Sequence, residues 1–495
     1  MTSEVKPAES ITDSEKMLGN SVEKEIKEQP KEYTRLFFQR PLGFKQAAMW
    51  VFVHYMSIGI IQGYYSSVQF NLQSLGASFD NQSTLTLALY PYSFKFIFSP
   101  LLDRYFIKWF GRSKTYIILG GGLIGSVFMF LGPTVQRMIT NIEVVPLTVL
   151  FMFLNLMVCV VQIAGEAWIL TLFTKEGKAK ATAFLNAGLT FGNLLGYNVF
   201  TPLNDLEWIN DNLYPNHPRT SPILTHTLFC FIIAILFFSQ NVLNLLFIAE
   251  EKITDSKAKD ICKILSIVPR HFTNSYMRKL LLYMFATRFI YFMVDPSFDL
   301  KLVRNGYLNI SRSVLANIDV VVYPTGFAAS LLIVYYLKKG NLMKMFHLTM
   351  FFIVLNGTFK YLCIVNLIET RVYLITFLGR VFTSFTTGLD FTGVFMMSFF
   401  NTIVNKAVGN TGVTCLIAML NQTGVLSQTI GFALMDHFNY HVIVLSCLSV
   451  QAAILLYTYK FTDYFDKRDS RYFDISEPEV KEGDLPTNIE YKAKA

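Results

Sequence analysis

Residues 90–114 read YPYSFKFIFSPLLDRYFIKWFGRSK and join the end of one apolar stretch to the start of the next. The first stretch carries one lysine, Lys95, and ends close to Asp103. A short basic segment follows and closes on Gly-Arg-Ser-Lys at residues 111–114. A carboxylate near a helix N-terminus is stabilised by the helix dipole and can pair with an arginine. The pattern therefore predicts a polar hairpin between two membrane-spanning helices.

The composition of the whole chain agrees with a membrane protein. Of 495 residues, 52% are hydrophobic and 16% are charged, whereas soluble domains have about a quarter of their residues charged. The net charge of +8 resides in loops and tails, so we expect a lipid bilayer around the protein and no nucleic-acid partner. Five of the six cysteines fall in apolar stretches and the sixth, Cys262, in a basic loop, a spacing that indicates neither disulfides nor a zinc site.

Apolar runs recur along the chain, and each is long enough to cross about 30 Å of hydrocarbon. We therefore predict an all-α polytopic membrane protein with about twelve transmembrane helices. The expected helices lie near residues 46–65, 83–101, 115–133, 146–173, 181–200, 222–249, 279–295, 313–337, 345–367, 371–400, 411–435 and 440–461.

A long basic loop divides these helices into two sets of six. We expect a solvated tail at 1–45, a first six-helix half at 46–249, a linker at 250–278, a second half at 279–461 and a tail at 462–495. Lysine and arginine crowd alternate loops, so by the positive-inside rule both termini, and the linker, face the cytosol. The sequons at Asn81 and Asn309 then fall on the opposite side; whether either is glycosylated is left open.

The 90–114 hairpin resembles the cytoplasmic hairpin of the major facilitator superfamily. Its wider pattern resembles, more narrowly, the acetyl-coenzyme A transporter family within that superfamily. The resemblance implies the major facilitator fold and two halves that rock around a midplane site. It also implies that the hairpin biases a two-state gating equilibrium through four residues, Asp103, Gly111, Arg112 and Lys114.

Further segments carry the same resemblance, which covers roughly residues 85–205 and 280–435. Ile-Ala-Gly-Glu-Ala-Trp ending at Trp168 resembles the family's fourth helix, with Glu166 in place of an aspartate and Gln162 where another aspartate is common. Arg288, seven residues before Asp295, resembles the seventh helix, and the Asn-x-x-Gly beginning at Asn421 resembles the eleventh.

Ionisable side chains inside spans indicate where function lies, because each costs several kcal/mol unless it faces a wet cavity or a partner. Those at expected membrane depth are Lys95, Glu166, Arg288, Asp319, Lys360, Arg380 and Asp390. Structural ion pairs are the alternative explanation for each of them. The set that we expect to bind substrate is Lys95, Glu166, Trp168, Arg288, Asp295, Lys301 and Asn421.

The resemblance implies transport of acetyl-coenzyme A from the cytosol into the lumen of the endoplasmic reticulum, where it would supply acetylation. A surplus of cations suits this polyanion. Two alternatives stay open: a carrier of another anionic or amphiphilic solute, as in muropeptide permeases, and a non-transporting membrane receptor. Another endomembrane such as the Golgi, the coupling ion and the oligomeric state also stay open. No phosphate-binding loop or catalytic constellation stands out, so neither an enzyme nor a cofactor is expected.

Overall fold

The computed structural model is helical almost throughout the part of the chain that it describes, which confirms the predicted all-α class. One isolated bridge, between Arg40 and Ile248, is the exception among the described residues. The described residues are 38–173, 177–250, 273–303, 310–337, 342–365, 372–389, 400 and 409–467.

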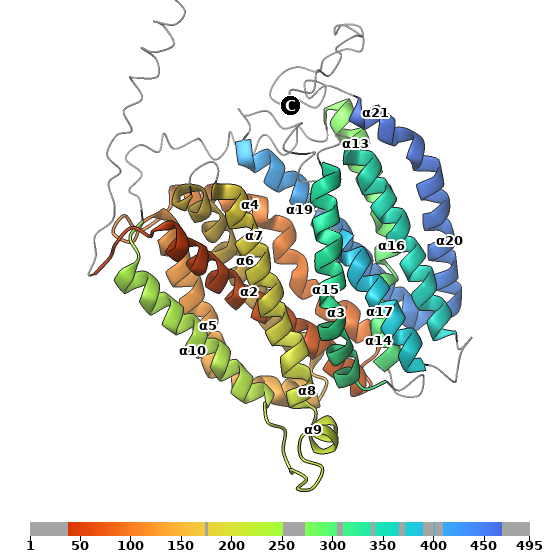
Figure 1. Ribbon diagram of the computed structural model, residues 1–495, viewed down its shortest axis with the longest axis horizontal. Coiled ribbons are helices and arrows are strands. Elements are labelled where there is room, and N and C mark those ends of the chain that lie inside the picture. The colour runs from red at the N-terminus through yellow and green to blue at the C-terminus, as the bar shows by residue number, and fades with distance from the viewer. Residues whose placement is uncertain are drawn as a thin grey trace, which may run out of the picture.

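Each of the twelve expected spans has a helical counterpart (Figure 1). In the first half the elements are α2 (Phe44–Ser74), α3 (Phe79–Thr86), η1 (Leu87–Phe94), α4 (Lys95–Arg104), α5 (Arg112–Thr140), α6 (Val144–Leu172), α7 (Gly177–Asn193), η2 (Leu194–Val199), α8 (Phe200–Asn204), α9 (Leu206–Asn212) and α10 (His226–Phe247). In the second half they are α13 (Ser275–Phe292), α14 (Asp295–Val303), α15 (Arg312–Leu337), α16 (Leu342–Ile364), α17 (Val372–Leu389), α19 (Gly409–His437), α20 (Tyr440–Thr458), η4 (Tyr459–Phe461) and α21 (Thr462–Asp466).

Five of the described helical segments are long and apolar enough by themselves to cross a membrane. They are Arg112–Thr140, Val144–Ile169, His226–Phe247, Leu342–Leu362 and Tyr440–Asp466.

One of the expected helices is broken, and there the sequence prediction was wrong about continuity. The helix expected at 83–101 is divided into α3, the 3₁₀ segment η1 and α4. Pro91 lies inside η1, and proline removes a backbone donor and disfavours an uninterrupted α-helix. The helix expected at 279–295 is continuous as α13 but ends at Phe292, and Asp295 begins α14.

Buried apolar side chains form two clusters. One consists of residues between Ala47 and Ile248, and the other of Phe79 with residues between Tyr276 and Phe465. Within the first cluster α2 lies so close to α7 and η2 that a Cβ on Gly192 of α7 or on Gly196 of η2 would collide with the α2 backbone. Glycine at these two positions therefore allows the helices to pack closely.

The two sets of helices touch at the end of the molecule that carries α9, at the bottom of Figure 1. There Asp80 N–H donates to the carboxylate of Asp436 at 2.6 Å, and Asn198 Nδ2 donates to the carbonyl of Ala316 at 2.8 Å. In the same region the hydroxyl of Ser313 donates to the carboxylate of Asp205. Residues from both halves therefore close this end.

Candidate functional site

A cavity of about 430 Å³ lies between the two halves. That volume is within the range of small-molecule binding pockets, about 300–1,000 Å³. Its lining comes from α2, η1, α6 and α7 on one side and from α13 and α19 on the other. The described lining residues are Gln62, Tyr65, Ser66, Gln69, Leu89, Tyr92, Asn155, Asn193, Arg288, Phe292, Leu420, Asn421, Gly424, Val425 and Gln428.

Amides, hydroxyls and aromatic rings dominate this lining, and Arg288 is its one charged residue among those described. The guanidinium of Arg288 lies 4.7 Å from the ring centre of Phe292, one turn further along α13. An arginine held against an aromatic face keeps its fork of donors oriented, which suits bidentate bonding to a phosphate or carboxylate. The cavity can therefore hold a polar ligand that has an anionic group.

Of the residues expected to bind substrate, the structure brings Arg288 and Asn421 to this cavity. Lys95 and Glu166 are not among its described lining residues. They form an ion pair with each other, with 2.6 Å between Lys95 Nζ and Glu166 Oε1. Gln162 Nε2 donates to the same Oε1 at 3.2 Å. In this conformation the pair thus ties α4 to α6.

Trp168 and Lys301 are likewise not among the described residues that line the cavity. Trp168 is buried, 1% exposed, in the core of the first half, where its ring lies edge-on to Trp50 at 4.5 Å between centroids. The ammonium of Lys301 lies 4.9 Å from the ring centre of Tyr440 and 5.9 Å from that of Phe79. Trp168 thus packs within the core, and Lys301 makes cation–π contacts near the closed end.

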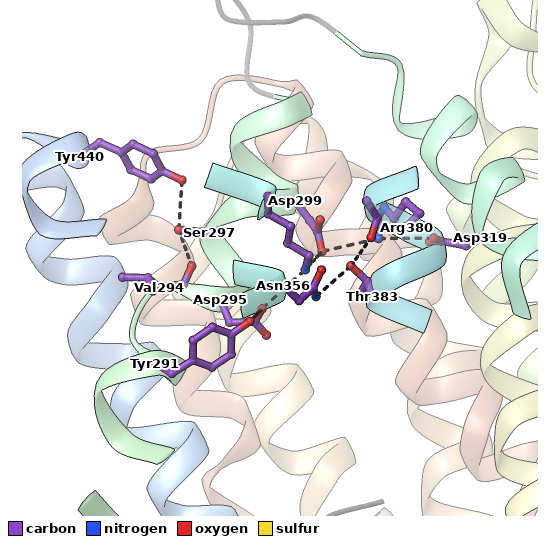
Figure 2. Close-up of polar contacts among 12 residues, drawn as sticks. Tyr291, Val294, Asp295, Ser297, Asp299, Asp319, Asn356, Arg380, Thr383 and Tyr440 are labelled. Carbon is purple, nitrogen blue, oxygen red and sulfur yellow. Dashed lines mark hydrogen bonds and ion pairs between the residues drawn. The ribbon is translucent and has the colours of Figure 1, made fainter. Parts of the chain in front are cut away.

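Asp295 belongs to a charged network in the second half (Figure 2). Its Oδ1 accepts a bond from the Tyr291 hydroxyl at 2.8 Å and pairs with Lys360 Nζ at 3.5 Å. The sequence left open whether Arg288 only neutralises Asp295. The structure gives Asp295 the lysine from α16 as its ion-pair partner, and Arg288 lines the cavity.

The polar hairpin between α4 and α5 is built around a residue that sequence reasoning missed. Glu250, only 4% exposed, accepts the backbone N–H of Ser113 at 2.8 Å and that of Lys114 at 2.9 Å. Its carboxylate therefore caps the N-terminus of α5, as the helix dipole favours. The prediction gave this role to Asp103, which lies in α4 but whose side chain is outside the described part of the structure.

The rest of the hairpin fits around this cap. Gly111 has φ +99°, a conformation that favours glycine, and the Glu250 side chain occupies the place where a Cβ would lie. The ammonium of Lys114 is fully buried and donates to the carbonyl of Ile248 at 2.6 Å. Burial raises the pKa of the Glu250 carboxyl, while bonds from the Lys114 and Ser113 amides and the charges of Lys114 and Arg112 oppose that rise.

The second half contains the same device. Asp466, the last residue of α21, accepts the backbone N–H groups of Met343 and Lys344 at 2.9 and 3.1 Å and so caps the start of α16. Lys344 Nζ also pairs with Asp463 at 2.7 Å. No local signal could reveal either cap, because each carboxylate lies more than a hundred residues from the amides that it binds.

Comparison with known proteins gives the fold of the chain and a family match to part of it. Residues 48–267 match the family model described as acetyl-coenzyme A transporter 1. An uncharacterized membrane protein of Saccharomyces cerevisiae is 28% identical over 176 residues, and an uncharacterized protein of Schizosaccharomyces pombe is 28% identical over 155 residues. These matches cover 32% and 31% of this chain, and only 31% and 29% of the length of those relatives.

Solved transporter structures match nearly the whole chain at low sequence identity. A mutant of the nucleoside transporter NupG has a TM-score of 0.58 with 11% identity, covering 84% of this chain and 99% of that one. A bacterial homolog of the human lysosomal transporter Spinster, in an inward-facing unoccupied conformation, has a TM-score of 0.51 with 12% identity over 87% of this chain and 96% of its own. Residues 48–267 are therefore similar to the acetyl-coenzyme A transporter family, and the chain is a multi-pass membrane protein with the fold of solved major facilitator transporters.

Proposed function

We propose that this protein carries acetyl-coenzyme A from the cytosol into the lumen of the endoplasmic reticulum, with both termini in the cytosol. The observation that carries the proposal is the cavity between the halves, with Arg288 as its one charged residue among the described lining. Phosphate is the natural partner of such an arginine. The match of residues 48–267 to the acetyl-coenzyme A transporter family supports this choice among anionic solutes.

The other lining residues suit the remaining parts of that molecule. Tyr65, Tyr92 and Phe292 supply aromatic faces against which an adenine ring can stack. Gln62, Gln69, Asn155, Asn193, Asn421 and Gln428 supply amide donors and acceptors for the peptide-like groups of the pantetheine arm. A site that pairs its ligand's polar groups in this way discriminates against analogues that lack them.

The test is uptake of labelled acetyl-coenzyme A into proteoliposomes that contain the full chain, with unlabelled coenzyme A and ATP as competitors. Arg288→Ala should weaken binding about ten- to a hundredfold, the loss of a charge-assisted bond of roughly 1.5–3 kcal/mol. Arg137→Ala, an exposed arginine on α5, is the matched control and should bind as the wild type does.

Competition by fragments then identifies what Arg288 contacts. If it binds the 3′-phosphate, Arg288→Ala should discriminate less between coenzyme A and its 3′-dephospho form than the wild type does. Unchanged affinity in a well-folded Arg288→Ala protein would remove Arg288 from the site. Absence of any acetyl-coenzyme A uptake by the wild type would refute the proposed substrate.

A further inference from the structure

The charged network around Asp295 continues through the second half as a chain of three carboxylates and two cations. Lys360 Nζ lies 3.5 Å from Asp295 and 3.6 Å from Asp299. Arg380 Nη1 lies 3.5 Å from Asp299 and 3.4 Å from Asp319. Figure 2 shows Asp299, Arg380 and Asp319 in one row, on α14, α17 and α15. We call these five residues the charge chain.

The charge chain is distinct from the substrate cavity. None of its members is among the described residues that line that cavity. Three of them, Asp299, Lys360 and Arg380, line a separate cavity of about 20 Å³. A space of that size holds about one water molecule and excludes any organic solute.

Its charges do not balance. Three ionised carboxylates, whose side chains are 17–29% exposed, against two cations that are each 9% exposed leave one net negative charge among these five residues. An uncompensated charge inside a protein costs several kcal/mol, and neighbouring carboxylates disfavour each other's ionised form. One bound proton would remove the imbalance without moving any residue.

We propose that the charge chain is a proton-binding site, that its proton resides on Asp319, and that this proton is the coupling ion of transport. The proposal rests on the proposed transport function for its coupling, but not for the existence of the site.

Geometry selects Asp319 among the three carboxylates. Asp295 has Lys360 and the Tyr291 hydroxyl, and Asp299 lies between both cations. Asp319 has one ion-pair partner among the described residues, Arg380 Nη1, and it shares that nitrogen with Asp299. It is therefore the carboxylate whose ionised form is least compensated.

The other elements packed against α15 supply no further charge to Asp319 from the described residues. The charges that act on it are those of Arg380, Asp299 and Lys360. On η2, the phenol of Tyr197 acts on Arg312 at the start of α15, and α8 carries no ionisable residue. The ionisable side chains in the middle of α2 are buried in the core of the first half; they are His54, Tyr55, Tyr64 and Tyr65.

Asp319 also lies where a proton can affect the alternation of the two halves. Ala316, one turn earlier on α15, accepts the bond from Asn198 of η2 that joins the halves at the closed end. Protonation of Asp319 removes its ion pair with Arg380 and so weakens the contact between α17 and α15. A two-state protein responds to a ligand, here a proton, that interacts differently with its two states.

The first test needs no substrate. A protonated buried carboxyl has a C=O stretch that an ionised one lacks, so infrared spectra of the purified full-length protein should show that band near neutral pH. It should disappear in Asp319→Asn and persist in Asp211→Asn, a control at an exposed aspartate of α9. A spectrum in which Asp319→Asn removes no carboxyl band would overturn the site, whatever the transported solute is.

The second test measures coupling in proteoliposomes with the membrane potential clamped by potassium and valinomycin. For the wild type, one direction of a pH gradient should drive accumulation of labelled acetyl-coenzyme A, about tenfold per pH unit for one coupled proton, with proton movement reported by a trapped pH dye. Asp319→Asn, which is permanently neutral, should exchange labelled for unlabelled substrate but neither accumulate it nor move protons. Wild-type uptake that ignores the pH gradient would overturn the coupling while leaving the proposed substrate intact. Gradient-driven accumulation by Asp319→Asn would do the same.

Discussion

Removal of the Glu250 carboxylate should destabilise the protein through a single contact, the cap on α5. In Glu250→Ala the N–H groups of Ser113 and Lys114 lose their acceptors, and both residues are at most 3% exposed. Each buried donor left without a partner costs about 1–3 kcal/mol, so we expect a loss of about 2–6 kcal/mol in the free energy of unfolding. The Lys114 ammonium also loses a nearby opposite charge.

Comparison of Glu250→Ala with Asp466→Ala distinguishes the loss of the cap on α5 from a general destabilising effect of mutation. Asp466→Ala removes the corresponding cap on α16, but Asp466 is more exposed than Glu250, so water can replace part of what is lost. We therefore expect Glu250→Ala to lower the midpoint of thermal unfolding in detergent, followed by tryptophan fluorescence, more than Asp466→Ala does. Equal midpoints for Glu250→Ala and wild type would refute the cap as a stabilising contact.

Glu250→Gln adds a pH dependence whose sign follows from burial. Burial raises the pKa of the Glu250 carboxyl in the folded protein above its pKa in the unfolded chain. The contribution of this carboxyl to stability is therefore fully present at pH values below the unfolded pKa and is lost as the pH rises through the folded pKa. Glutamine does not titrate, so the stability of wild type relative to Glu250→Gln should fall over that interval of pH. A relative stability that rises with pH would show that the amide bonds and basic neighbours outweigh burial.

Two further predictions concern residues that the sequence singled out. Trp168→Ala should lower the free energy of unfolding by about 3–5 kcal/mol, as expected for the truncation of a large buried side chain. The folded fraction of this variant should bind acetyl-coenzyme A as the wild type does. Weaker binding by that fraction would give Trp168 a role in the site. The sequon at Asn81 should remain unglycosylated in cells, because it lies within α3 and its Ser83 is buried and donates to the carbonyl of Thr429. Glycosidase treatment should therefore leave the gel mobility of the protein unchanged. A mobility shift that is lost in Asn81→Gln would contradict this prediction.

The position of the helices was predictable because long apolar runs in a membrane protein have few alternative explanations. The breaks were harder to predict, since a proline such as Pro91 is tolerated inside spans and does not by itself say where the helix changes geometry. Arg288 stood out because a charge within an apolar run requires a wet or paired environment. The neutral amides that line the cavity, such as Gln62 and Asn193, gave no comparable signal.

Pairing between distant residues was outside the reach of the sequence. Lys95, Glu166 and Lys360 were recognised as charges at membrane depth, and Asp295 as a candidate for the site. Which of them pair depends on the rotation and depth of separate helices, and only the folded structure brings Lys95 to Glu166 and Lys360 to Asp295. The same limitation explains why Glu250 was not expected at the cap on α5, from which it is far along the chain.

The two caps bear on how the halves move. Glu250 binds α5 within the first half and Asp466 binds α16 within the second, so neither cap joins the halves. If the halves rock as rigid bodies, both caps stay intact. The contacts that must break are those at the closed end, such as Asp80 to Asp436. The cap on α5 therefore stiffens the first half and the cap on α16 stiffens the second, which is what allows a small change at α15 to be transmitted to the whole interface.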